Sequence, residues 1–183
     1  MLIPLQRLER IFDERRSQEK AEVREYETWF QGCTQLFLDL GGNRGDTILR
    51  WLTEESYSGR AKDQSVDKIY SLQARQEFCV LSFEPNSKFD SVLRALESRM
   101  QGRGFKVKVK TNTAVSDKFS RSMIYIDDVS THSYGTSLLS EKKVNFGGKF
   151  HTLGKGQPIN LVDLNLIMST QLSSSTQLSS IFL

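Results

Sequence analysis

The sequence predicts an α+β fold, and three observations lead to that prediction. Apolar residues recur at helical spacing over the first forty positions, strand-like and helix-like patterns alternate in the middle, and the C-terminal third is rich in serine, threonine and glycine. We therefore expect a long N-terminal helix or helical hairpin, a β-α-β-β core, and a C-terminal hairpin with an extended arm. The expected parts are an N-terminal helical region (1–56), an α+β core domain (57–168) and a low-complexity arm (169–183).

The N-terminal helical prediction covers residues 5–40. Apolar side chains gather near both ends, from Leu5 to Phe12 and from Tyr26 to Leu40, and the charged stretch 13–22 between them suits a solvated helix. A continuous helix of this length would span about 54 Å at 1.5 Å per residue, which is more than a domain of this size needs. We therefore expect one end to reach a partner or a neighbouring subunit.

The glycine-rich segment from Gly41 to Gly45 is predicted to end this helix through left-handed C-cap geometry. Asp46 or Thr47 then caps a short helix whose inward residues are Ile48, Leu49, Trp51 and Leu52. No strand is expected before the glycines.

The centre of the chain has the clearest pattern. A helix is predicted over 66–76 and a strand buried on both faces over 78–83, followed by a helix capped by Asn86 or Ser87 and ended by Gly102 or Gly104. The alternating segment 105–110 and a further strand over 122–126 complete a β-α-β-β unit. The predicted inward stripe of the second helix is Phe89, Val92, Leu93, Leu96 and Met100.

Towards the C-terminus, strands over 143–146 and 149–153 are predicted to form a hairpin with a Gly-Gly turn. The stretch 159–168 fits a strand and a helix equally well.

The tail contains an exact repeat, STQLSS at 169–174 and again at 175–180. One leucine in six polar residues cannot hold a segment in a core, so we expect an arm that contacts another chain. Replication slippage in a tolerant tail is the alternative explanation of the repeat. The arm residues expected at the contact are Leu172, Leu178, Ile181, Phe182 and Leu183.

Composition limits the remaining choices. A chain of 183 residues can bury a real core, and a net charge of +3 is too small to identify a nucleic-acid partner. There is no secretory signal and no run of 18 apolar residues, which predicts no membrane contact and a cytoplasmic or virion location. Cys33 and Cys79 lack CxxC spacing and are expected to be reduced core residues.

Basic residues gather between positions 99 and 121, with Asp117 as the one acid. On the strand FKVKVK the lysines share one face, where they can bind phosphates or an acidic protein surface, or guard the strand against edge-to-edge aggregation. The candidate binding residues are Arg99, Arg103, Lys106, Lys108, Lys110, Lys118 and Arg121.

Catalytic signals are sparse. His132 and His151 have no zinc-site spacing, and the segment LGKGQP lacks the spacing of a phosphate-binding P-loop. Asp127 and Asp128 follow an apolar strand and offer a site for Mg²⁺, but neighbouring strand residues point to opposite faces. We expect no cofactor, no metal site and no catalytic residue.

These observations favour a non-enzymatic assembly subunit that forms a homo-oligomer or joins a larger complex, such as a connector or tail terminator of a virus or phage particle. A nucleic-acid-binding protein that uses the basic strand is the first alternative. A metal-dependent phosphoryl-transfer enzyme built on Asp127 or Asp128 is the second.

Overall fold

The computed structural model describes residues 5–53, 71–129, 136–139, 143–146, 148–173 and 180–182. These ranges contain five α-helices and three sheets, which confirms the predicted α+β class. The elements are α1 (Leu5–Phe30), β1 (Gln35–Leu40), α2 (Asp46–Thr53), α4 (Leu72–Arg75), β2 (Phe78–Glu84), the 3-10 turn Ser87–Phe89, α5 (Asp90–Gly102), β3 (Lys106–Thr111), β4 (Thr113–Ser116), β5 (Ser120–Tyr125), β6 (Lys143–Phe146), β7 (Lys149–Thr152), β8 (Gly156–Asp163), α6 (Leu164–Ser173) and β9 (Ser180–Phe182).

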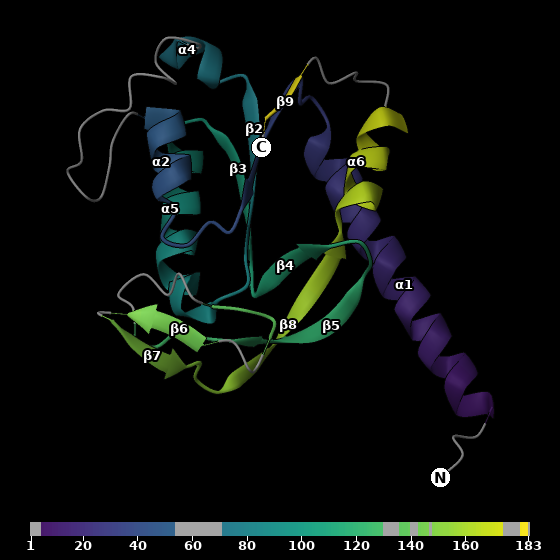
Figure 1. Ribbon diagram of the computed structural model, residues 1–183. Coiled ribbons are helices and arrows are strands. Elements are labelled where there is room, and N and C mark those ends of the chain that lie inside the picture. Colours follow the sequence, from purple (N-terminus) through teal and green to yellow (C-terminus); the bar gives the residue numbers. More distant parts are fainter. Residues whose placement is uncertain are drawn as a thin grey trace.

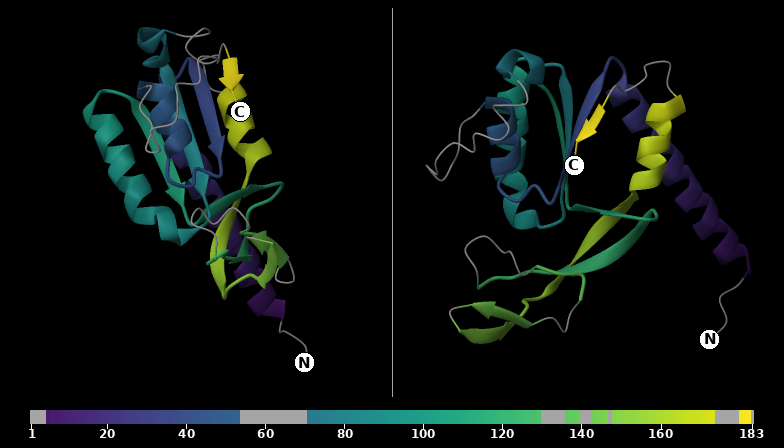
Figure 2. Two further views of the ribbon diagram at one scale, coloured as in Figure 1. Left: turned by 60° about the vertical axis from the view of Figure 1, so that its left-hand side comes forward. Right: turned by 45° about the horizontal axis from the view of Figure 1, so that its top comes forward.

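The first sheet is parallel throughout and has the strand order β3-β2-β1-β9. Helices α2 and α5 cover one face of this sheet, and α1 and α6 cover the other (Figures 1 and 2). A strand covered on both faces is apolar at nearly every position, as β2 is, since all seven of its residues are buried.

Two apolar cores follow from the alternation of side chains along these strands. Phe37 of β1 packs on the α2 and α5 side, where its ring stacks on that of Trp51 with centroids 4.6 Å apart. Leu36 and Leu38, its neighbours in β1, belong to the core on the α1 and α6 side. The inward residues predicted for α2 and α5 are confirmed, with Val92 partly buried at the margin.

The prediction of a helix over residues 33–40 is wrong. Helix α1 ends at Phe30, Gly32 adopts a left-handed φ of 79°, and Gln35–Leu40 forms the strand β1. The apolar residues of this segment fit a helical stripe as well as a strand. In the fold they contact both cores, which a helix at this place would not allow.

The predicted β-α-β-β order is present, but its strands belong to two sheets. β2, α5 and β3 form a parallel unit of the first sheet, whereas β4 and β5 flank β8 in a second, mixed sheet. This second sheet lies beyond the ends of β2 and β3 (Figure 1). Of the helix predicted over 66–76, α4 is the described part.

The C-terminal hairpin is confirmed as β6 and β7, with Phe146 opposite Lys149. The stretch 159–168 combines both alternatives, because β8 ends at Asp163 and α6 begins at the next residue. Ile167 of α6 is buried against the core on the α1 side.

The tail differs from a free arm in two places. Helix α6 continues to Ser173, through the first residues assigned to the arm, since a helix anchored by Ile167 propagates at small cost per added residue. Further on, Ser180–Phe182 pairs in parallel with Gln35–Phe37 of β1 and becomes the outer strand of the chain's own sheet.

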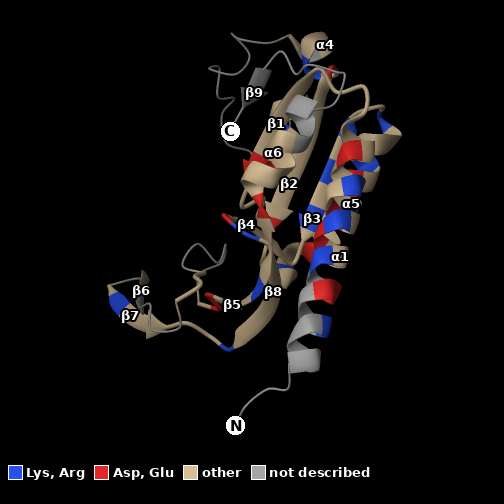
Figure 3. Ribbon diagram, turned by 90° about the vertical axis from the view of Figure 1, so that its right-hand side faces the viewer, with Lys and Arg blue, Asp and Glu red and all other residues tan. Residues whose placement is uncertain are grey.

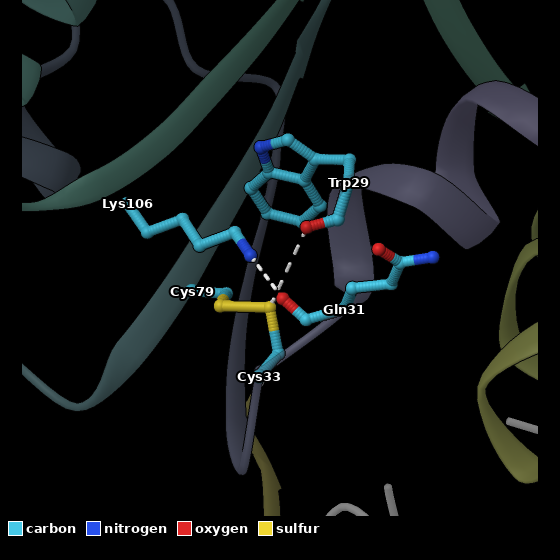
Figure 4. The surroundings of a disulfide bond; sticks show 5 residues. All are labelled: Trp29, Gln31, Cys33, Cys79 and Lys106. Carbon is cyan, nitrogen blue, oxygen red and sulfur yellow. Dashed lines mark hydrogen bonds between the residues drawn. A yellow bond between two sulfur atoms is a disulfide. The ribbon is translucent and has the colours of Figure 1, made fainter. Parts of the chain in front are cut away.

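The two cysteines form a disulfide, so the prediction of reduced thiols is wrong. Cys33 precedes β1, Cys79 lies in β2, and their Cα atoms are 5.8 Å apart (Figure 4). The parallel register sets Leu36 against Cys79 and thereby brings the two residues within bonding reach, although they are separated by 46 positions. Disulfides are rare in cytosolic proteins, so this bond does not support the cytoplasmic part of the expected location.

Among the helices of the described ranges, none is both long enough and apolar enough to serve as a membrane span.

Removing the disulfide is expected to lower the free energy of unfolding by about 2 to 4 kcal/mol, because the bond restricts a long loop of the unfolded chain. Urea titration of the wild type and of the double variant Cys33→Ala/Cys79→Ala measures this loss. Dithiothreitol should weaken the wild type and leave the variant unchanged. Equal midpoints for all samples would show that the bond does not form.

Candidate functional site

Lysines recur along β3 (Figure 3), and those at 108 and 110 pair with acidic residues of helix α1. The carboxylate of Glu25 accepts from Lys108 Nζ and Lys110 Nζ, each at 2.6 Å, and Lys110 Nζ also lies 3.7 Å from Glu22. As predicted, the apolar residues Phe105, Val107 and Val109 are buried.

The two acids of α1 that lie beside these lysines have pKa values shifted in opposite directions. Burial raises the pKa of Glu22 despite the nearby Lys110. Burial also acts to raise the pKa of Glu25, but hydrogen bonds from Lys108 and Lys110 outweigh it, and the pKa of Glu25 is lowered. The positive charge of Lys108 and Lys110 is therefore already engaged within the chain.

Lys106, the first lysine of the row, is held by the end of α1. Its Nζ donates to the carbonyl of Gln31 at 2.6 Å and lies 5.8 Å from the ring centre of Trp29 (Figure 4). Burial lowers the pKa of this lysine. A cation over an aromatic face is an attractive arrangement that helps to hold α1 on the sheet.

The other four basic candidates are exposed, and they come from two separate parts of the fold. Arg99 is in the last turn of α5 and Arg103 follows it, whereas Lys118 and Arg121 lie beside and in β5. Arg121 and Lys110 line a common cavity of about 620 Å³ between α1 and the second sheet.

The remaining candidates are dispersed. Asp127 is buried and its carboxylate accepts from the backbone N–H of Val129, while Asp128 is exposed. His151 lies on β7 and His132 lies outside the described residues. No group of three potential metal ligands occurs in the described part of the chain.

The arm residues are described only in part. Ile181 and Phe182 lie in β9 and Leu172 lies in α6, while Leu178 and Leu183 fall outside the described ranges. The predicted contact of these residues with another chain stays a prediction.

A different site emerges where β1 and β2 end, at what we call the carboxyl edge of the first sheet. The strand order changes direction at β1, which has β2 on one side and β9 on the other. In open parallel sheets ligands bind outside the carboxyl ends of the strands at such a switch point. The residues after β1 are the glycine-rich segment Gly41–Gly45, and the next helix, α2, starts at Asp46.

The glycine loop fits tightly against β2. The backbone N–H groups of Gly41 and Gly42 both donate to the carbonyl of Phe83, at 2.9 and 3.1 Å. A side chain at Gly42 would collide with the hydroxyl of Ser82, and Gly45 combines a left-handed φ of 80° with close contact to Leu96. These glycines allow the loop to approach the neighbouring strand, a packing function that the predicted C-cap does not include.

Glu84, the last residue of β2, joins two loops. Its Oε2 accepts from the backbone N–H of Asn43 at 2.6 Å, and its Oε1 accepts from that of Asn86 at 2.7 Å. Burial raises the pKa of Glu84, although these two hydrogen bonds favour the charged form. Each oxygen keeps a second lone pair that can accept from a ligand.

Asp39 is a second buried carboxyl at this edge. It is 7% exposed, and its Oδ2 accepts from the hydroxyl of Ser82 at 2.9 Å. Burial raises its pKa, and the Ser82 hydrogen bond offsets this only in part.

Further polar atoms at the carboxyl edge are buried without a hydrogen bond among the described residues. They are one oxygen each of Asp46 and Asp90, in the first turns of α2 and α5, and the side-chain nitrogen of Asn86. An unsatisfied buried polar group costs about 1 to 3 kcal/mol, so such a cluster in a native protein needs an explanation, such as ordered water or a ligand.

Comparisons with known proteins do not assign this site. The chain matches no family model, and neither the curated proteins nor the solved structures contain a match to it.

The site could not be predicted from the sequence as long as residues 35–40 were expected to be helical. The available signal was the order of apolar segment, Asp39, glycine loop and helix, which indicates a ligand-binding loop only when the apolar segment is a strand. Glu84 gave a weaker signal, as an acid at the end of the next predicted strand.

Replacing Lys110 with methionine is expected to lower the free energy of unfolding by about 1 kcal/mol, since the ion pair with Glu25 is partly exposed and the lysine also lies over Tyr26. Urea denaturation measures the change, with Lys118→Met, a substitution of an exposed lysine, as the matched control. Equal losses in the two variants would contradict the importance of the pairing with α1.

Replacing Asp39 with asparagine is expected to flatten the dependence of stability on pH. Because the pKa of Asp39 is raised above its ordinary value of 3.8, the folded state holds more protons than the unfolded chain as the pH rises above that value, and wild-type stability falls. The Asp39→Asn variant should therefore be more stable than the wild type at pH 8, with the difference shrinking towards pH 4. Denaturant midpoints across this range measure it, and parallel curves would contradict it.

Proposed function

We propose that the chain binds a nucleoside cofactor at the carboxyl edge of its first sheet. The observation that supports this most directly is Glu84, a buried acid at the end of β2 beside the glycine loop that follows β1. In dinucleotide-binding folds an acid in the second half of the β-α-β unit holds the ribose hydroxyls, and the glycine loop admits the rest of the ligand. Glu84 and Gly41–Gly45 are assigned these two functions.

The charges at this edge favour a cofactor with a cationic group over one with phosphates. Asp39 is buried beside the glycine loop and Asp46 begins α2, at the positions where a pyrophosphate would meet the loop and the helix N-terminus. The negative charges of Asp39 and Asp46 would repel those of a pyrophosphate. Arg44 is the basic residue in the segment Gly41–Gly45. An ammonium or sulfonium group would instead be stabilised by these carboxyls.

A nucleoside that carries both groups is S-adenosylmethionine, and the corresponding reaction class is methyl transfer. Such a cofactor supplies an electrophilic methyl group to a nucleophile and leaves as a neutral thioether. The contribution of this chain is to hold the ribose through Glu84 and to place the cationic part near Asp39. The acceptor is not assigned by these residues.

The earlier hypotheses remain predictions of lower support. An assembly subunit is compatible with the edge position of β9, although that strand pairs with its own sheet. Nucleic-acid binding by Lys106, Lys108 and Lys110 would have to compete with their contacts to α1.

Isothermal titration tests the proposal. We expect S-adenosylmethionine to bind, and ATP and NAD to bind at least about tenfold more weakly, because their phosphates would approach Asp39 and Asp46. The Glu84→Gln variant should weaken binding about tenfold or more, since a hydrogen bond to a charged acceptor is lost.

Glu97→Gln is the matched control. Glu97 is an acid on α5 whose Oε1 accepts from the backbone N–H of Val109, so the same substitution is made away from the carboxyl edge. Tight binding of ATP or NAD with no response to S-adenosylmethionine would disprove the cationic assignment. Absence of binding for S-adenosylmethionine, ATP and NAD alike would disprove the cofactor site.

A further inference from the structure

Gln157 of β8 connects the second sheet to the loop that follows Glu84. Its Nε2 donates to the carbonyl of Pro85 at 3.2 Å and to Asn112 Oδ1 at 3.3 Å, and its Oε1 accepts from the hydroxyl of Ser87 at 2.8 Å. A side-chain amide has two N–H donors and one carbonyl oxygen, so these bonds use both donors and one lone pair of the oxygen.

Two of the three partners enclose Asn86. Pro85 and Ser87 lie on either side of this buried residue, whose backbone N–H donates to Glu84. Because Glu84 also accepts from Asn43 of the glycine loop, a shift of the 85–87 segment would alter both loops of the proposed site. Gln157 therefore contacts the segment 85–87 without belonging to the carboxyl edge itself.

Asn112, the third partner of Gln157, is itself held in place by β8. Asn112 joins β3 to β4 with a left-handed φ of 53°, and its carbonyl accepts from the backbone N–H of Asn160 in β8 at 3.0 Å. Gly156, the neighbour of Gln157, is packed so closely that an added Cβ would lie 2.9 Å from the ring of Tyr125. The backbone that carries Gln157 is thus held on both sides.

We propose that Gln157 is a positioning residue for the nucleoside site and that the second sheet serves to hold the loop between β2 and α5. The inference rests on the proposed cofactor site, since it assigns a support to that site. A residue that merely adds stability would change global unfolding, whereas a positioning residue changes the loop and the affinity that depends on it.

The test compares Gln157→Met with Gln101→Met. Gln101 is a matched control, because its Nε2 also donates to a backbone carbonyl, that of Val107 at 2.8 Å, at the opposite end of the sheet. Three quantities are measured: affinity for S-adenosylmethionine by titration, hydrogen exchange of the Asn43 and Asn86 amides without ligand, and the melting temperature.

We expect Gln157→Met to weaken binding about tenfold and to speed exchange of both amides by a similar factor, because the loop loses its two hydrogen bonds to Gln157 and the amide loses its anchor on Asn112. The melting temperature should change no more than in Gln101→Met. Ser87→Ala should reproduce part of the effect. Ser87→Thr keeps the hydroxyl and should therefore keep the affinity and the exchange rates of the wild type.

Affinity and exchange in Gln157→Met equal to those in Gln101→Met would overturn the positioning function. If the wild type binds no nucleoside, the proposed cofactor site is overturned together with the assignment of Gln157 to it. Faster exchange confined to the Gln157→Met variant would then show that the link holds the loop for some other purpose.

Discussion

The parallel pairing of β1 with β2 is the interaction on which the rest of this structure depends. Six consecutive pairs, from Gln35 with Phe78 to Leu40 with Phe83, align the two strands over their length. Because parallel strands end at the same edge, this pairing sets the glycine loop and Glu84 side by side. At the opposite end the same register places Cys33 near Cys79, so one pairing determines both the disulfide and the candidate site.

The carboxyl edge is costly for folding. Asp39 and Glu84 are buried acids whose pKa values are raised by burial, which means that their charged forms are less stable in the fold than in water. A chain selected for stability alone would carry small neutral residues at these positions. Buried acids at the carboxyl edge of a parallel sheet are compatible with ligand binding, since carboxyls with shifted pKa values concentrate at functional sites.

The other ionic cluster has the opposite character. Lys108 and Lys110 both pair with Glu25 where α1 crosses β3, and the charges are partly exposed. This cluster orients a helix on an edge strand that would otherwise present a bare row of lysines. Helix α5 protects the same strand from its other side, because Glu97 accepts from the N–H of Val109 and Gln101 donates to the carbonyl of Val107.

The sequence by itself determined the elements whose periodicity is local. The buried strand β2, the stripe of α5, the alternation of β3 and the β6–β7 hairpin were all predictable, because each pattern fits one kind of secondary structure. Tertiary structure decided the rest. Residues 35–40 suit a helix or a strand until β2 is available as a partner, and the pairing of Lys110 with Glu25 joins residues 85 positions apart. The candidate site depends in the same way on contacts between Asn43 and Glu84, 41 positions apart, which no local pattern records.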